Sequence, residues 1–482
     1  MKLYQKPKFL SDSEMQQIHE ASLYLLEKKG VVFKSKDAVE ILVKNGCTAD
    51  KKTVFFPREV IEKCLAAVPA KFRIEAINPE RSFTVGDGLI IHPAGGEVFL
   101  QKKDAQRIAE PGIKEFEDLQ KLYQYCKNMN MAGYQPLSPS DVPLETRNLR
   151  CLYASMMYSD KPWLAPMDNN SGEDKHRELD MYEIVYGKDF LKNHYVTWSI
   201  VTPESPLVYS KFSCESIIEY AKLNQPVALV SAPMSGITSP VHILGTIVQA
   251  NTETLAGLCL AQCVRPGVPV LPSASLTYGN LKLATWECSS PDTTLMLAGA
   301  IQMYKDFYHL PARAQTGVTS SKCVDYQAGM ESMQSLLLTA LMDVDVTSQS
   351  MGTLENLMAI SFEKTLIDDE LVDRVRRIID GIEVNEETMS LDIIMQTKHG
   401  SNFLMAPSTI RYMRDGWQPQ ISDWNSFAPW SKMEYRDIEE RAEKKVAEII
   451  ENAPCLLDRD TQRDLEKFIN SSENNIQDRF GK

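Results

Sequence analysis

From about residue 130 onward, short apolar runs and amphipathic helices alternate along the chain. The apolar runs follow a proline at the end of a helix, as Pro226 precedes VALVSAPM and Pro269 precedes VLPSAS. On the far side of a run, Ser290 places a capping hydroxyl before Pro291, which suits the first position of a helix. The runs therefore predict strands, and the repeat predicts a series of strand–helix units.

Eight such units predict a (β/α)8 TIM barrel. The seven clear strands are expected at Met131–Leu137, Trp163–Met167, Tyr195–Val201, Val227–Met234, Val270–Ser275, Ala312–Gly317 and Val344–Ser350. An eighth, Phe403–Ala406, is shorter and follows a polar loop. The alternative is an open doubly wound sheet, but no G-x-G-x-x-G opens a helix after a strand, and the Gly95-Gly96 pair precedes the repeat.

The same pattern divides the chain into three parts. Residues 1–125 do not follow the repeat and predict an N-terminal extension or cap of helices and short strands. Residues 126–430 form the predicted barrel. Residues 431–482 are strongly charged with an apolar stripe at helical spacing through Val446 and Ile449, which predicts a helical segment. We expect this segment to pack on the barrel or on a second subunit. Because its stripe is apolar, we expect the protein to be a homo-oligomer.

Composition narrows the function. Of 482 residues, 43% are hydrophobic and 24% charged, which is typical of globular proteins. The net charge of -13 repels phosphate backbones and anionic lipids, so we expect no nucleic acid partner and no membrane partner. The first residues, MKLYQKPKFL, lack the apolar run of a signal peptide, and no later stretch stays apolar for the roughly 20 residues of a membrane span. We therefore expect a cytoplasmic protein.

The ten cysteines are scattered, and several lie in apolar segments, which indicates reduced and mostly buried thiols. Cys259 and Cys263 are spaced one helical turn apart. Because no histidine or carboxylate flanks them at the spacing of a zinc site, no metal site is predicted.

Active sites of TIM barrels lie at the carboxyl ends of the strands, so we inspected the end of each apolar run and the loop after it. The residues there are aromatic or polar: Tyr134, Trp163, Trp198, Tyr278, Trp286 and Phe362, with Asp168, Glu204, Gln315, Asp325, Gln327, Glu331, Glu355 and His399. Aromatic faces attract a cation by about 0.5 to 2 kcal/mol each, and quaternary ammonium groups depend on them most. Equally, single aromatic residues more often belong to a core, and Asp325 suits a helix cap. The residues alone predict a barrel enzyme for a small polar or cationic substrate.

Several blocks resemble one family. Asp325, Gln327-Ala328-Gly329 and Glu331 match the D-x-Q-A-G-x-E segment of the trimethylamine methyltransferase superfamily. The segments APMSGITSPVHILGTIVQANTETLAGLCLAQCVRPGVPV and SFEKTLIDDELVDRVRRIIDGIEV, and the RAEKKVAEII tail, resemble the same family in order and spacing. The resemblance covers nearly the whole chain.

The resemblance implies a methyltransferase whose substrate lies in the barrel mouth, where a separate corrinoid protein docks and accepts the methyl group on Co(I). This chain has no D-x-H-x-x-G cobalamin signature, so the cobalamin is expected on the partner and no tightly bound cofactor is expected here. Trimethylamine enzymes of the family carry pyrrolysine, whereas this chain has only standard residues. Pyrrolysine-free members demethylate betaines, so we expect glycine betaine, proline betaine, carnitine or γ-butyrobetaine as the substrate.

The resemblance also carries site residues over by position. Glu331, Gln327 and His399 are the catalytic candidates. The candidates for a substrate pocket are mainly aromatic, with one residue for a carboxylate: Trp163, Tyr134, Phe362, Tyr278, Trp198 and Arg411. Arg313 lies at the start of a predicted strand, so we expect it to face the opposite end of the barrel. His399, Arg411 or backbone N–H groups in a loop are better candidates to bind the carboxylate.

Two other classes of protein remain open. A lyase with a carboxylate base, acting on a small cationic substrate, would work without a corrinoid partner. A non-catalytic betaine-binding protein would be expected to carry a signal sequence, which this chain does not show. Neither class accounts for the ordered family-like blocks.

Overall fold

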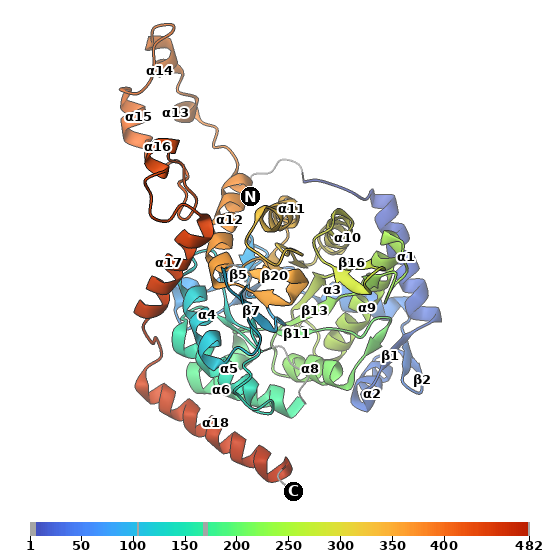
Figure 1. Ribbon diagram of the computed structural model, residues 1–482. Helices are drawn as coiled ribbons and strands as arrows, with labels where there is room; N and C mark the ends of the chain where they lie inside the picture. The colour runs from blue at the N-terminus through green and yellow to red at the C-terminus, as the bar shows by residue number, and fades with distance from the viewer. Residues whose placement is uncertain (1–5, 104–105, 167–171, 481–482) are drawn as a thin grey trace.

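Parallel strands form the centre of the computed structural model, which describes residues 6–103, 106–166 and 172–480 (Figure 1). Six strands pair in the order β11 (Ser199–Val201), β13 (Val227–Ser231), β15 (Val270–Ala274), β18 (Arg313–Gln315), β19 (Val346–Ser348) and β6 (Ile90–Ile91). A second parallel pair is formed by β9 (Ala132–Gly133) and β10 (Trp163–Leu164). Two hydrogen bonds link residues near this pair with residues at or near the two outer strands of the larger sheet. The Asn130 N–H donates to the Ile91 carbonyl at 2.8 Å, and the Ala165 N–H donates to Thr197 Oγ1 at 3.2 Å.

All seven clearly predicted ranges contain one of these strands, but the eighth prediction was wrong. Phe403–Ala406 forms no strand, and its apolar side chains are exposed. The place beside β19 belongs to β6, which lies within the predicted N-terminal extension. A run of two apolar residues without a preceding helix and proline gives no strand signal, so β6 could not be recognised from the pattern.

Helices cover the outer side of the strands (Figure 1). They are α4 (Ile113–Tyr125), α5 (Arg147–Tyr158), α6 (Gly172–Tyr186), α8 (Lys211–Lys222), α9 (Ile243–Val264), α10 (Pro291–Gln302), α11 (Tyr326–Leu341) and α12 (Phe362–Asp380). Helix α9 is buried on almost every side because it packs on β13 and β15 and is covered by the N-terminal α1 (Asp12–Lys28). No helix in the described ranges has the length and apolar character needed to cross a membrane.

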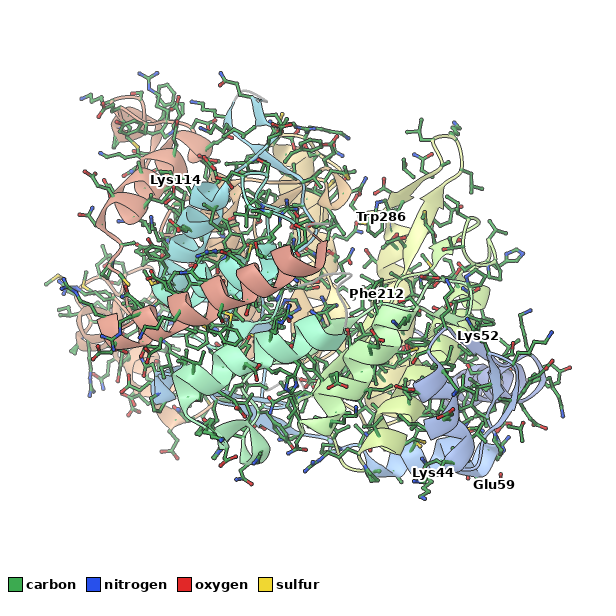
Figure 2. All side chains as sticks on the ribbon, turned by 90° about the horizontal axis from the view of Figure 1, so that it is seen from below. Lys44, Lys52, Glu59, Lys114, Phe212 and Trp286 are labelled. Carbon is green, nitrogen blue, oxygen red and sulfur yellow. The ribbon has the colours of Figure 1, made fainter. Side chains whose placement is uncertain are left out.

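The N-terminal residues form an outer layer and an interior plug. The layer contains α1, α2 (Lys36–Lys44), α3 (Arg58–Ala67) and β1 to β3 (Val31–Phe33, Thr48–Asp50, Thr53–Phe55), and Figure 2 shows its Lys44 and Glu59 at one edge of the molecule. The hairpin of β4 (Phe72–Ile74) and β5 (Phe83–Val85) packs on Trp198, Leu271 and Val346. Apolar side chains thereby fill the amino ends of the strands, which leaves the carboxyl ends for polar chemistry.

Residues 382–419, which we call the arm, leave the body after α12 (Figure 1). The arm carries α13 (Glu386–Met389), α14 (Leu391–Gln396) and α15 (Pro407–Tyr412). After α16 (Phe427–Trp430), α17 (Ile438–Asn452) packs on α12 and α4, and α18 (Arg459–Phe480) packs on α5 and α6. The end of the chain is therefore helical, as the charge and apolar pattern predicted.

Glu370 of α12 anchors the chain where it returns from the arm. Its Oε2 accepts hydrogen bonds from the backbone N–H groups of Gln420, Ile421 and Ser422 at 2.8, 2.7 and 3.0 Å, and Arg374 donates to Oε1 at 2.9 Å. Burial raises the pKa of Glu370, but these bonds outweigh it and lower the pKa from 4.5 to about 2. The carboxylate thus fixes the base of the arm to the body.

We predict that Glu370→Gln costs about 1–3 kcal/mol in the free energy of unfolding, because a charged acceptor of several N–H groups is lost. The folded pKa of about 2 lies below the ordinary 4.5, so this stabilisation is complete above the ordinary value and is lost as the pH falls from 4.5 toward 2. Urea unfolding of both proteins at a series of pH values measures the difference.

Glu451→Gln is the matched control, because Glu451 is exposed near the end of α17. Its substitution should leave the free energy of unfolding unchanged at every pH. An equal pH dependence for the wild type and Glu370→Gln would contradict the role of this anchor.

Candidate active site

Buried polar side chains gather at the carboxyl ends of the strands. His92 follows β6, Tyr134 follows β9, Gln349 follows β19, and Arg313 lies on β18. None of the four is more than 4% exposed. In parallel α/β folds, the carboxyl ends of the strands are where ligands bind, so this group is the candidate site.

Arg313 and His92 form the centre of this group. The Arg313 Nε–H donates to His92 Nε2 at 2.8 Å, and an Nη1–H donates to Ser273 Oγ at 2.6 Å. Because arginine can only donate, Nε2 of the imidazole accepts, and the Nδ1–H donates to the Pro93 carbonyl at 2.8 Å. Burial and the positive charge of Arg313 lower the pKa of His92 well below its usual value. The imidazole is therefore neutral and fixes the orientation of the guanidinium.

The positive charge of Arg313 has no counterion within the described ranges of the chain. The residue is 2% exposed, and its partners, His92 and Ser273, are neutral and use two of its five N–H donors. Burial lowers the pKa of Arg313 to about 10, so the group is still charged at neutral pH. An isolated buried charge is costly unless it is paired. A buried cation of this kind is an attractive partner for an anion.

Aromatic rings lie beside the same histidine. The ring centroids of Tyr134 and Trp198 are 5.8 and 6.0 Å from that of His92, both nearly perpendicular to it. A Cβ atom at position 95 would lie 2.0 Å from the Tyr134 ring, so only glycine leaves room for the ring there. Tyr134 and Gln349 both have positive φ values, 60° and 64°, although neither is glycine. Such strained backbone concentrates at functional sites.

Several further polar atoms near the strands are buried without a hydrogen-bond partner among the described residues. They are Glu97 Oε2, Gln135 Oε1, Trp198 Nε1, Thr277 Oγ1, Thr347 Oγ1 and Ser348 Oγ. Buried polar groups nearly always have partners, so these atoms make the interior suited to polar groups. Burial raises the pKa of Glu97 to about 8, which keeps this carboxyl mostly protonated at neutral pH.

The structure brings the predicted residues Glu331 and Gln327 together on α11. Glu331 accepts hydrogen bonds from Thr319 Oγ1 at 2.6 Å, the Ser320 N–H at 2.8 Å and Gln327 Nε2 at 2.9 Å. Burial raises the pKa of Glu331, but these bonds outweigh it and hold the pKa below its ordinary value. Glu331 is therefore an ionised carboxylate that holds the loop after β18.

The predicted aromatic residues lie in different surroundings. Tyr134 and Trp198 belong to the interior, as described above. Trp163 instead lies against Tyr182 and Tyr186 of α6, with ring centroids 6.3 and 5.8 Å away, and its Nε1–H donates to the Ser159 carbonyl at 2.9 Å. Its indole points away from the interior, so we leave it out of the proposed site.

Phe362 and Tyr278 are partly buried at the edge of the helix layer. Phe362 is the first residue of α12, and Tyr278 lies on β16 (Thr277–Asn280). Trp286, on the paired β17 (Thr285–Glu287), sits on a hairpin that projects from the body (Figure 2).

His399 and Arg411 do not lie at the strand ends. Both are exposed on the arm, and Arg411 forms an ion pair with Glu387 at 3.6 Å. Asp168 and Met167 lie outside the described residues.

Cys259 and Cys263 lie on α9 beside Cys64 of α3. Within the ranges that the structure describes, no group of three or more His, Cys, Asp or Glu side chains is arranged to hold a metal ion.

Sequence reasoning missed His92, because His92 follows the two-residue strand β6, which the pattern could not reveal. Arg313 begins β18, as expected from its place near the start of a predicted run. It pairs with Val346, the first residue of β19, on one side and with Ser273, the fourth residue of the five-residue strand β15, on the other. The pattern could not show how far its side chain reaches: the guanidinium bonds His92, the residue after the end of β6.

The fold is that of an α/β enzyme, and its candidate site lies at the carboxyl ends of the parallel strands. The chain belongs to the trimethylamine methyltransferase (MTTB) family, whose model matches residues 2–477. The family and the methyltransferase class that the sequence predicted are thus confirmed.

Two similar proteins and one solved structure illustrate this relationship. A glycine betaine methyltransferase of Desulfitobacterium hafniense (strain Y51) is 31% identical over 97% of both chains. A trimethylamine methyltransferase of Methanosarcina barkeri (strain Fusaro / DSM 804) is 27% identical over 95% of this chain and 94% of the relative. The crystal structure of the Methanosarcina barkeri monomethylamine methyltransferase covers 91% of this chain and 88% of its own, with a TM-score of 0.55 at 11% identity, and so shares the fold.

We predict that Glu331→Gln lowers the free energy of unfolding by about 1–3 kcal/mol, because an amide replaces a carboxylate that accepts several hydrogen bonds. Gln327→Ala removes one exposed hydrogen-bond donor to Glu331, so it should lower the free energy of unfolding by less than about 1 kcal/mol. The stabilisation by Glu331 is present above its ordinary pKa and is lost as the pH falls through the lowered folded pKa. Urea unfolding at several pH values measures both effects, and equal losses for the two variants would contradict this assignment.

Proposed function

We propose that this enzyme removes a methyl group from a quaternary amine that also carries a carboxylate, and transfers it to the Co(I) centre of a separate corrinoid protein. The observation that supports this most is the buried guanidinium of Arg313, which has no counterion among the described residues. A betaine supplies that anion. Glycine betaine, proline betaine, carnitine and γ-butyrobetaine all fit this description.

The other end of a betaine is a cation, which needs different surroundings. A quaternary ammonium group cannot donate hydrogen bonds, so aromatic faces suit it better than carbonyl groups do. Tyr134 lies within the same interior cluster as Trp198 and beside His92. We therefore assign the carboxylate to Arg313 and the trimethylammonium group to the aromatic side of the site near Tyr134.

The corrinoid of the partner supplies the nucleophile that accepts the methyl group. During transfer, the carbon–nitrogen bond breaks and its electron pair stays on nitrogen, which leaves as a neutral tertiary amine. No proton has to be donated, so the enzyme needs no general acid at the nitrogen. Its residues act by holding the substrate: Arg313 fixes the carboxylate, and neutral His92 fixes Arg313.

Similarity to known proteins supports this substrate class. The relative at 31% identity is named a glycine betaine methyltransferase, and the relatives at 27% are named trimethylamine methyltransferases. Because this chain contains only the standard residues, we place it with enzymes for betaines.

We also infer that the eight parallel strands close into one (β/α)8 barrel. The bonds from Asn130 to Ile91 and from Ala165 to Thr197 at both ends of the β9–β10 pair support closure. Strand β6 would complete the ring, so the barrel would begin before residue 125.

The corrinoid protein is proposed to dock at the barrel mouth, in the cytoplasm. Loops after β13 and β15 expose large apolar side chains near the carboxyl ends of these strands. They are Ile237, Val241, Leu281 and Leu283, which are 41 to 70% exposed. Exposed apolar groups of this kind are typical of protein interfaces.

We predict that methylation of a Co(I) corrinoid by the purified enzyme proceeds with one of the four betaines and not with trimethylamine. The visible absorbance change from Co(I) to methyl-Co(III) reports the reaction, first with the cognate corrinoid protein and then with free cob(I)alamin. Transfer from trimethylamine alone would contradict the assignment. Product formation from a betaine without any corrinoid would instead favour a lyase.

We predict that Arg313→Lys raises KM for the betaine by roughly 10- to 100-fold, because a bidentate partner of the carboxylate is lost. Tetramethylammonium lacks a carboxylate, so the rate of methyl transfer from it should be the same for the wild type and for Arg313→Lys. Arg376→Lys is the matched control, since Arg376 is a partly buried arginine that bonds Asn130 Oδ1 at 3.1 Å before β9 begins. An unchanged KM for the betaine in Arg313→Lys would refute the proposed carboxylate site.

A further inference from the structure

The arm, residues 382–419, has an apolar surface that the described part of the chain does not cover. Its helices α13, α14 and α15 contain no buried residue. The large apolar side chains that are more than two-fifths exposed are Ile382, Val384, Met389, Leu391, Ile394, Met395, Phe403, Leu404, Met405, Ile410 and Met413. Helices this short are unstable alone in water, so their apolar faces need a partner surface.

The area of this surface is sufficient for a stable interface. Side chains of this size and exposure offer an apolar area on the order of 1,000 Å², whereas a stable interface buries roughly 800 Å² on each partner. Isolated monomers seldom expose a contiguous apolar patch of this size.

The arm is also fixed in its outward direction before any partner binds. Glu370 holds the backbone of residues 420–422, as described above. The Trp417 Nε1–H donates to Asp373 at 2.8 Å, and the Arg374 guanidinium lies 4.3 Å from the centroid of the Trp417 ring. Fixing the base reduces the ordering cost of binding.

A second uncovered apolar surface lies on the body of the same chain. It is a groove of about 580 Å³ between α1, α9 and α10, and its lining includes Phe9, Ile18, Leu244, Ile247 and Leu295. Leu244 is 55% exposed and Leu295 41%. The arm rises above α12, whereas α1 and α10 lie on another side of the body, so the arm points away from the groove of its own chain (Figure 1).

We propose that the arm of one copy packs into this groove on a second copy of the chain. Each interface then joins the arm of one copy to the groove of another, and every copy has both an arm and a groove. The alternative occupant of the arm is the corrinoid protein, which has to bind and leave in every turnover and would leave the apolar arm exposed in between. Permanent interfaces are more apolar than transient ones, so a second copy of the chain suits the arm better.

Two carboxylates near these surfaces already have partners within the chain. In the arm, Glu387 is paired with Arg411 and bonded by the Tyr412 hydroxyl. In the groove, the carboxylate of Glu14 accepts hydrogen bonds from the N–H and hydroxyl of Ser11 at 2.8 and 2.7 Å. These charges keep their partners when the apolar side chains meet.

Sedimentation of the full-length protein at micromolar concentration tests the proposal. The wild type is expected to be an oligomer, and both the arm variant Leu404→Ser/Met405→Ser and the groove variant Leu244→Glu are expected to shift the protein to monomers. Leu144→Ser is the control, because Leu144 is 65% exposed outside the arm and the groove. A monomeric wild type, or an oligomer that both variants leave intact, would overturn the proposal.

Cross-linking between copies tests where the arm binds. Cys323 and Cys455, the exposed thiols among the described residues, are first replaced by Ser. Met405→Cys and Leu244→Cys are then placed on differently tagged chains, which are mixed and treated with a short bis-maleimide. Cross-links between the two tags, absent when Leu144→Cys replaces Leu244→Cys, are the expected result. Equal cross-linking to both positions, or an arm that is covered only when a corrinoid protein is added, would overturn the proposal.

Discussion

The buried charge of Arg313 is the constraint around which the interior is arranged. A guanidinium that is almost fully removed from water has to be held by neutral acceptors until an anion arrives. His92 and Ser273 do this, and the requirement that Nε2 of His92 accept a bond keeps the imidazole neutral. The apolar hairpin of β4 and β5 packs on Trp198, Leu271 and Val346 near the amino ends of the strands, whereas the guanidinium bonds His92 beyond the end of β6.

The surroundings of Arg313 suit a molecule that is neutral overall but carries separated charges. In the proposed function its positive charge binds the carboxylate of the substrate, and the ammonium group lies on the aromatic side near Tyr134. Glu97 would add a negative charge to this interior if it were ionised. Burial raises its pKa to about 8, so it stays mostly protonated and would not repel such a carboxylate. Under this proposal a simple amine would lack the anion that pairs with Arg313.

The strands, the family and the methyltransferase class could be predicted from the sequence because each rests on patterns that extend over many residues. The placement of single side chains could not. The two-residue strand β6 carries no periodic signal, and with it His92 was missed. Arg313 begins its strand as expected, but the bond from its guanidinium to His92, after the end of β6, joins two segments that the pattern treats separately. For Trp163, the first residue of a predicted strand, the pattern could not show on which side of β10 its indole lies.

Helix α12 connects the arm to the candidate site at the strand ends. Near its middle, Asp368 accepts hydrogen bonds from the Gly352 N–H at 2.8 Å and from Lys364 at 2.6 Å, which fixes the loop that begins at Gln349. Two residues further along the same helix, Glu370 fixes the base of the arm. The helix that orients the loop beside the substrate site therefore also orients the arm. Covering the arm on a second copy would hold α12 in place, and with it the position of Gln349 against Gly95.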